Sequence, residues 1–249
     1  MTLERVDNIT DNYNINKERK EDMAKELALP LNSEKENMQN KKCDYKTLAI
    51  MTLYSKMTPK EQQEEEEHEE NYRYVYKNNI IEFTDEVEEL SKNKIDTVIK
   101  NMRKLSKLEG NLVTAVKNQD GEICYVINYA SEQDREYVTI EEDMLKFLIN
   151  TGNGNVIKTY VLLKYMCAKG EKKITRSYIA QQIGLATNSH KNLQVVSDIT
   201  ESLANNGFIR KRRHISTGTK EEVYYSVNSH EDWLRIKEEK KKEQFSLGN

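Results

Sequence analysis

The spacing of apolar residues in the C-terminal half predicts a short helix, a turn and a longer helix. Apolar positions of the longer helix recur at intervals of three and four, which places them on one face. They are Leu193, Val196, Ile199 and Leu203. Thr175 is a suitable N-cap for the shorter helix, and Gly184 is a suitable stop, because glycine adopts the left-handed conformation at little cost.

A β-hairpin is predicted directly after these helices. Asn206-Gly207 ends the second helix, and Phe208-Ile209 begins a strand. Alternating apolar residues from Val223 to Val227 predict the returning strand, with Ser216–Thr219 as the turn. The four residues Arg210–Arg213 give the first strand a run of cations.

The same order of elements recurs in weaker form in the N-terminal half. We predict a helix from Thr84, as its cap, to Leu90, and a turn at Ser91–Asn93. The buried face of the next helix comprises Ile95, Val98, Ile99, Met102, Leu105 and Leu108. Gly110 ends it, and residues 112–127 alternate around a turn as a second hairpin. The predicted fold class is therefore mainly α with small β-hairpins (α+β).

The remaining segments complete the expected domain organisation. Residues 1–42 are polar and are predicted to be mostly disordered, with a weak helix over 18–27. The alternative is a segment that folds on binding a partner. An amphipathic helix over 44–57 and a strand over 72–76, which Ile80–Phe83 continues or pairs beside, belong to a first domain over 43–130. A polar linker, 129–137, leads to a second domain over 138–230. Its further helices are expected over 140–148 and 156–167. Trp233 is expected to pack the charged tail, 231–249, onto the second domain, with fraying beyond residue 238.

Charge is distributed unevenly along this chain of 249 residues, although its net charge is only -3. Residues 58–90 hold 3 Lys and Arg against 12 Asp and Glu, including the acidic run 60–70. Residues 91–117 hold 7 basic against 2 acidic residues, and residues 138–230 hold 13 against 8. The basic charge therefore gathers on the two predicted helix pairs, which favours a nucleic-acid partner. The acidic run is typical of a solvated surface, and the alternatives are a contact for a basic partner or a screen against nonspecific DNA binding.

Three apolar stretches of the second half occur in a recognisable order: Ile157–Tyr165, then Ile179-Ala180 with Ile183–Leu185, then Leu203–Ile209. In this order they resemble the winged-helix domain of plasmid replication initiators and phage replisome organisers of Gram-positive bacteria. The resemblance covers about residues 138–228, and it implies DNA binding. With the repeat, it leads us to expect tandem winged helix-turn-helix domains. Ala186–Leu193 is longer than the family's usual turn, so either the second helix starts early or the turn is enlarged.

Candidate DNA-binding residues lie on the outward face of each second helix and on the cationic strand. In the first half they are Lys94, Thr97, Lys100, Asn101 and Lys104. In the second half they are Asn188, His190, Lys191, Asn192, Gln194, Arg210, Lys211, Arg212 and Arg213. Lysine and arginine suit phosphate contacts, and an asparagine can read an adenine edge. The alternative is that these are ordinary solvated residues. Asp198 lies near the same face and is excluded, because it repels phosphate.

No pattern in the chain predicts catalysis. A Ser/His/Asp or Cys/His arrangement, a His-rich metal motif and a phosphate-binding loop are all missing from the sequence. Cys43, Cys124 and Cys167 are odd in number and lack metal-ligand spacing, which favours buried reduced thiols in a cytoplasmic protein. No apolar run approaches the roughly 20 residues of a membrane span. We therefore expect a protein that is not an enzyme and needs no cofactor.

The leading hypothesis is sequence-specific binding of double-stranded DNA, at origin repeats of a plasmid or phage. The partners expected with it are a helicase or helicase loader and a second copy of the chain in a homodimer. One alternative is a transcriptional regulator with the same fold, which the sequence does not separate from an initiator. The other is a winged-helix module that binds proteins.

Overall fold

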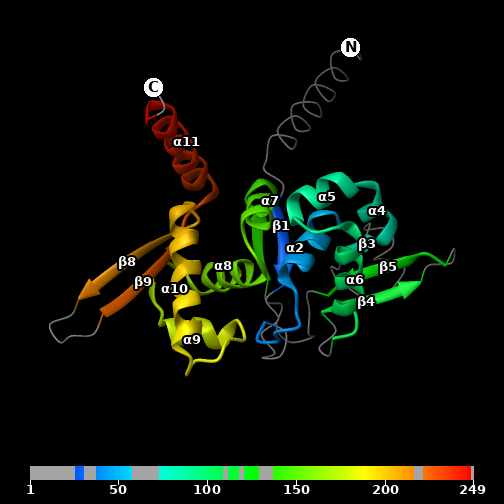
Figure 1. Ribbon diagram of the computed structural model, residues 1–249, viewed down its shortest axis with the longest axis horizontal. Helices are drawn as coiled ribbons and strands as arrows, with labels where there is room; N and C mark the ends of the chain where they lie inside the picture. The colour runs from blue at the N-terminus through cyan, green and yellow to red at the C-terminus, as the bar shows by residue number, and fades with distance from the viewer. Residues whose placement is uncertain are drawn as a thin grey trace, which may run out of the picture.

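The computed structural model describes residues 26–30, 38–57, 73–108, 112–117, 121–128, 137–215 and 221–247 (Figure 1). Within these ranges the protein is a mixture of helices and small antiparallel sheets. The predicted acidic run 60–70, most of the linker 129–137 and the hairpin turn 216–219 lie outside the described residues.

The first half is built around one buried helix. Its elements in chain order are α2 (Tyr45–Leu53), β2 (Lys56–Met57), β3 (Arg73–Tyr76), α4 (Lys77–Glu82), α5 (Thr84–Ser91), α6 (Ile95–Leu105), β4 (Val113–Lys117) and β5 (Ile123–Ile127). The strands form a sheet in the order β2-β3-β5-β4. Eight of the nine residues of α2 are buried, so this helix is covered on all sides rather than amphipathic as predicted.

The second half begins with a strand and ends with a long helix. Its elements are β6 (Tyr137–Glu141), α7 (Glu142–Thr151), α8 (Gly154–Met166), β7 (Lys172–Lys173), α9 (Arg176–Gln182), α10 (His190–Asn205), β8 (Ile209–Ile215), β9 (Glu221–Val227) and α11 (His230–Leu247). The sheet order is β7-β9-β8. Helix α8 contributes an unbroken buried run from Ile157 to Leu163, so the prediction of a core-supporting helix is confirmed.

The two halves share one topology. In each, a buried helix (α2 or α8) leads to a strand, then to two helices, then to a hairpin. The first strand pairs in both halves with the second strand of the hairpin, which gives β3-β5-β4 and β7-β9-β8. Helix α4 and strand β2 are additions to the first half. The prediction of two helix pairs, each followed by a hairpin, is confirmed.

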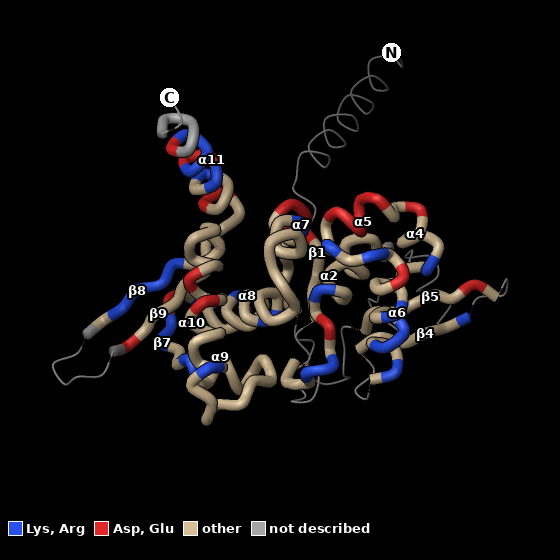
Figure 2. Tube along the Cα trace, in the orientation of Figure 1, with Lys and Arg blue, Asp and Glu red and all other residues tan. Residues whose placement is uncertain are grey.

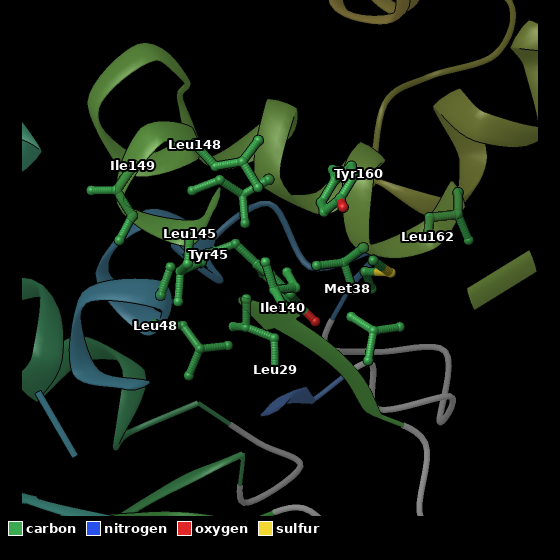
Figure 3. Close-up of a cluster of buried hydrophobic side chains, with 14 of the residues drawn as sticks. Leu29, Met38, Tyr45, Leu48, Ile140, Leu145, Leu148, Ile149, Tyr160 and Leu162 are labelled. Atoms are coloured by element: carbon green, nitrogen blue, oxygen red, sulfur yellow. The ribbon is translucent and has the colours of Figure 1, made fainter. Parts of the chain in front are cut away.

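The halves are joined by a continuous core instead of being separate bodies on a linker. Figure 3 shows Leu29, Met38 and Tyr45 from the N-terminal part beside Ile140 and Tyr160 from the second half. Strand β1 (Glu26–Pro30) pairs with β6, and Leu27 and Leu29 are fully buried. The prediction that residues 1–42 are disordered is therefore wrong for this strand and for the turn at 38–42. The apolar residues are too few for a domain of their own, but they complete a core supplied by distant residues.

Two local predictions between β3 and α5 are wrong. Ile80–Phe83 does not extend a strand, because α4 begins at Lys77 and turns Ile80 into the core. Short apolar runs do not distinguish strand from helix by periodicity alone. Thr84 is not an N-cap: its hydroxyl donates to the carbonyl oxygen of Ile81 at 2.6 Å, since α4 ends immediately before α5.

The predicted features of the second helix pair are confirmed in detail. The Thr175 hydroxyl oxygen accepts the backbone N–H of Tyr178 at 3.2 Å, as an N-cap should. Gly184 has φ +82°, and Gly207 has φ +76°, so both helix ends use the left-handed conformation. Because α10 begins at His190, Ala186–Ser189 of the long segment is turn and residues 190–193 belong to the helix, so the helix starts before Leu193.

Helix α11 begins against the second half and then projects from it (Figure 1). Trp233 is fully buried and contacts Phe208 and Phe147, with ring centroids 5.7 Å and 5.8 Å away. The prediction that Trp233 packs on the second half is confirmed. The predicted fraying beyond residue 238 is wrong, because α11 continues to Leu247. This stretch is highly charged, and the ammonium of Lys240 donates to the carbonyl oxygen of Asn205 at the end of α10.

Candidate nucleic-acid interface

Helix α6 presents a stripe of cations to solvent. Its inner face buries Val98, Ile99, Met102 and Leu105, which orients Lys100 and Arg103 outward. Lys107, in the turn after the helix, continues the same line and is also exposed. In the described part of the chain no ion pair engages these three side chains, and the acidic residue within α6 is Asp96. The stripe is therefore available to an anionic partner.

Lys94 precedes α6 and is held by a carboxylate. Its ammonium lies 2.9 Å from one oxygen of Glu88 on α5, while the other oxygen accepts the backbone N–H of Ile95 at 2.9 Å. The hydrogen bond to Glu88 raises the pKa of Lys94, and the same bond lowers the pKa of Glu88. A phosphate must compete with Glu88 for Lys94. Thr97, three residues after Lys94 in the first turn of α6, is exposed.

Asn101 faces the N-terminus of α2. Its amide nitrogen donates to the Asp44 carboxylate at 3.1 Å, and its amide oxygen accepts from the Lys104 ammonium at 3.3 Å. Asp44 also accepts the hydroxyl of Thr47 at 2.6 Å and the backbone N–H of Lys46 at 3.1 Å. Reading an adenine edge requires both groups of the Asn101 amide, so this residue reads a base only after leaving Asp44.

The start of α10 and the turn before it place four of the predicted residues at the surface. They are Asn188, His190, Lys191 and Gln194. Asn192 is half-buried, and its amide donates back to the carbonyl oxygen of Ala186 at 3.0 Å, which closes the turn. Ser189 caps the helix by accepting the backbone N–H of Asn192 at 3.4 Å. These two hydrogen bonds fix the turn, and they leave Asn188 and His190 exposed at the N-terminus of α10.

Further along α10 the exposed face turns acidic. Asp198 is exposed and accepts from the amide nitrogen of Gln194 at 2.7 Å, so the two side chains occupy one surface, as predicted for Asp198. Glu201 follows one turn later. Lys191 is the basic residue of this helix. The outer face of α10 is thus close to neutral, whereas that of α6 is cationic.

All four cations of β8 are paired with carboxylates on surrounding elements. Lys211 and Arg213 point to one side of the strand and donate to Glu201, at 2.8 Å and 2.7 Å. Arg210 and Arg212 point to the other side. Arg210 lies 3.2 Å from Asp232 of α11. Arg212 donates to both oxygens of Glu171, and its guanidinium lies 4.6 Å from the centre of the Tyr224 ring.

These pairs shift the pKa of the acidic partners. Hydrogen bonds from Lys211 and then Arg213 lower the pKa of Glu201. The hydrogen bond from Arg212 lowers the pKa of Glu171 in the same way. The carboxylates therefore stay ionised at neutral pH and neutralise most of the hairpin charge. Lys211 is the most enclosed of the four cations, with 6% of its side chain exposed.

Basic and acidic residues gather on different elements of the described chain (Figure 2). Lys and Arg line α6 and β8, whereas Asp and Glu gather along α4, α5 and the start of α7, on another edge of the molecule. The hairpins β4-β5 and β8-β9 extend toward opposite ends, with α6 and α10 between them (Figure 1). Both α6 and α10 have one face exposed to solvent.

Sequence reasoning missed two members of the α6 stripe and every carboxylate of the hairpin. Arg103 and Lys107 follow Lys100 at intervals of three and four, so periodicity could have found them. Glu171 and Asp232 carry no local signal, because they reach β8 from distant parts of the chain.

When the chain is compared with known proteins, no family model, curated protein or solved structure matches it. In the described ranges, His, Cys, Asp and Glu side chains do not cluster in a way that would hold a metal ion. Nor does any described helix combine the length and the apolar character that crossing a membrane requires. The three cysteines are buried and form no disulfide bond, and burial raises the pKa of Cys43 to about 12.

Proposed function

We propose that the protein binds double-stranded DNA in a sequence-specific manner through two winged helix-turn-helix units, and that it initiates replication of a plasmid or phage. The observation that carries this proposal is the repeated topology, which leaves one exposed helix beside one hairpin in each half. An α-helix of this kind fits the major groove, and the neighbouring hairpin reaches the backbone.

The charge distribution supports the proposal and changes its emphasis. The α6 stripe of Lys100, Arg103 and Lys107 is a positive surface that no ion pair among the described residues neutralises. The hairpin cations contribute only when phosphates replace Glu201, Glu171 and Asp232. In this proposal α6 supplies much of the salt-dependent affinity, and the start of α10, which has a single lysine among polar residues, contributes more to base reading than to phosphate contact.

Binding of short fragments of the protein's own replicon tests the proposal. The full chain is expected to bind specific fragments, with log affinity falling linearly against log salt by about 0.9 for each phosphate contacted. Lys100→Ala combined with Arg103→Ala should weaken binding to every fragment and flatten that slope. Glu89→Gln, a change on the acidic edge, serves as the control that leaves both unchanged. If the wild-type chain binds no fragment at low salt, the proposal is wrong.

The position of the bound sites separates replication from transcription. Iterated short repeats next to an AT-rich region favour an initiator that recruits a helicase or helicase loader. A single operator overlapping a promoter favours a transcriptional regulator with the same fold. A homodimer on paired repeats would appear as a complex of doubled protein stoichiometry.

One observation favours a second candidate, a protein-binding module. Ile81 and Phe83 are exposed, by 41% and 47%, on the acidic edge formed by α4 and α5. Apolar residues among carboxylates suit a basic protein surface. Replacing Arg210, Lys211, Arg212 and Arg213 by alanine distinguishes the two. Loss of DNA binding together with loss of replication supports the initiator, whereas full function without DNA binding supports the module.

A further inference from the structure

Residues 38–44 occupy the junction between the two halves and touch three elements that the proposed function uses. This segment directly precedes α2, and in Figure 1 it lies between α6 and the α9–α10 turn. Met38 and Cys43 are buried, whereas Lys41 and Lys42 are exposed, so one side of the segment packs against the core and the other faces solvent. Its contacts reach α6, α8 and the turn before α10.

The first contact is with α6. Asp44 accepts the Asn101 amide at 3.1 Å while it also caps α2 through the backbone N–H of Lys46. Asn101 lies on the helix proposed to read DNA, but its amide points back to the junction. The position of α6 is thus tied to the N-terminus of α2.

The second contact is with α8. Lys158 is 2% exposed, and its ammonium donates to the carbonyl oxygen of Asn40 at 3.0 Å and lies 5.4 Å from the Tyr45 ring centre. Burial lowers the pKa of Lys158, and the charge of Asp44 acts in the opposite direction. An amine placed in the core needs such partners, because an unpaired one is costly.

The third contact is with the turn that precedes α10. A Cβ atom on Gly184 would lie 2.1 Å from the carbonyl oxygen of Gln39, so the two backbones touch. Only a residue without a side chain permits this approach, and the φ of +82° requires glycine as well. Asn101, Lys158 and Gly184 therefore hold one short segment from three directions.

We propose that residues 38–44 act as a brace that fixes the separation of α6 and α10, and hence the spacing of the two DNA half-sites the protein accepts. The consequence for spacing rests on the proposed function, whereas the brace itself does not. In this view Asn101 is a positioning residue, and it does not read a base. The continuous core and the β1–β6 pairing hold the halves together, and the brace sets the positions of α6 and α10 relative to each other.

Two variants loosen the brace from different sides. Asn101→Ala removes the bond to Asp44 and leaves the α2 cap intact. Lys158→Met retains most of the side-chain volume, and Asn40 keeps the backbone N–H of Cys43 as a donor at 3.1 Å. Asn78→Ala, an exposed asparagine on α4, is the matched control. Thermal unfolding of each variant confirms that it is folded.

A distance measurement tests the brace without DNA. Spin labels on cysteines introduced at Arg103 and Lys191, both exposed, report the separation of α6 and α10, while the native cysteines are buried. The full chain should give one narrow distance distribution, and each brace variant a clearly broader one. An unchanged distribution in both variants would overturn the proposal.

Binding to paired half-sites tests the consequence. Inserting one base pair moves one half-site by about 3.4 Å along the axis. The wild type should lose affinity by about tenfold, the scale of one mismatched base pair, and the brace variants by much less. If Asn101→Ala instead weakens binding to an isolated half-site and keeps the spacing preference, Asn101 reads a base and the brace is wrong. A wild-type chain that binds no DNA refutes the proposed function alone, since the distance measurement still decides the brace.

Discussion

Glu201 on α10 accepts a hydrogen bond at 2.8 Å from Lys211 on β8. This pair joins the helix and the hairpin that together form the proposed second DNA-binding unit. Arg213 donates to the same carboxylate, so one acidic residue holds two of the four hairpin cations. In the free protein Glu201 cancels much of the hairpin charge, and we propose that a phosphate replaces it in the complex with DNA.

Replacing Glu201 by glutamine should therefore strengthen DNA binding. Glu201→Gln removes the carboxylate that Lys211 and Arg213 share, so their ion pairs with Glu201 no longer have to break when phosphate binds. We expect an affinity higher by roughly threefold to tenfold and a salt dependence steeper by about one unit of slope, which fluorescence anisotropy across salt concentrations measures. Glu89→Gln carries the same change on the acidic edge and should have no effect. Weaker binding by Glu201→Gln would mean that the carboxylate orients the cations for DNA.

Alanine substitutions along the α6 stripe should weaken binding independently of DNA sequence. Lys100, Arg103 and Lys107 are exposed, and each is expected to neutralise one phosphate. Each single substitution should reduce the salt slope by about one unit and lower the affinity for specific and nonspecific DNA alike. Titrations with two unrelated sequences check this. A loss confined to one sequence would show that the residue contacts a base.

Trp233 should be a major contributor to the stability of the second half. Its ring is fully buried against Phe208, which stacks on it at 5.7 Å, and against Phe147. Trp233→Ala should lower the free energy of unfolding by about 3–5 kcal/mol, the range for large aromatic residues removed from cores. Urea unfolding followed by circular dichroism measures it. Leu234→Ala, at the exposed neighbouring position, should cost far less, and equal costs would contradict the packing described here.

Acid should weaken the contact between helix and hairpin before the core unfolds. Hydrogen bonds from Lys211 and Arg213 lower the folded-state pKa of Glu201 below its unfolded value. The stability contributed by Glu201 is therefore present above the unfolded pKa of about 4.3 and is lost as pH falls through the folded pKa. Free energies of unfolding measured from pH 6 downward should fall less steeply in Glu201→Gln than in the wild type. Parallel curves would show that this pair does not contribute to acid sensitivity.

Local structure was predictable where one element carried its own signal. Thr175 as a cap, Gly184 as a stop and the apolar face of α10 were all read correctly, because capping and periodicity depend on near neighbours. The strand at Leu27 was missed, since its partner, Ile140, lies in the second half. Ile80 was assigned to a strand because a short apolar run fits either structure, and only the packing below it favours a helix.

The candidate site was predictable as a set of exposed cations, but their partners were not. By itself the amino-acid sequence determined two helix pairs, two hairpins and the segregation of charge, since these follow from residue order over short distances. The tertiary structure alone decided which cations are available. Arg212 meets Glu171 across 41 positions, and Asn101 meets Asp44 across 57. Contacts over such separations depend on how the whole chain packs, and they distinguish an available lysine on α6 from a neutralised arginine on β8.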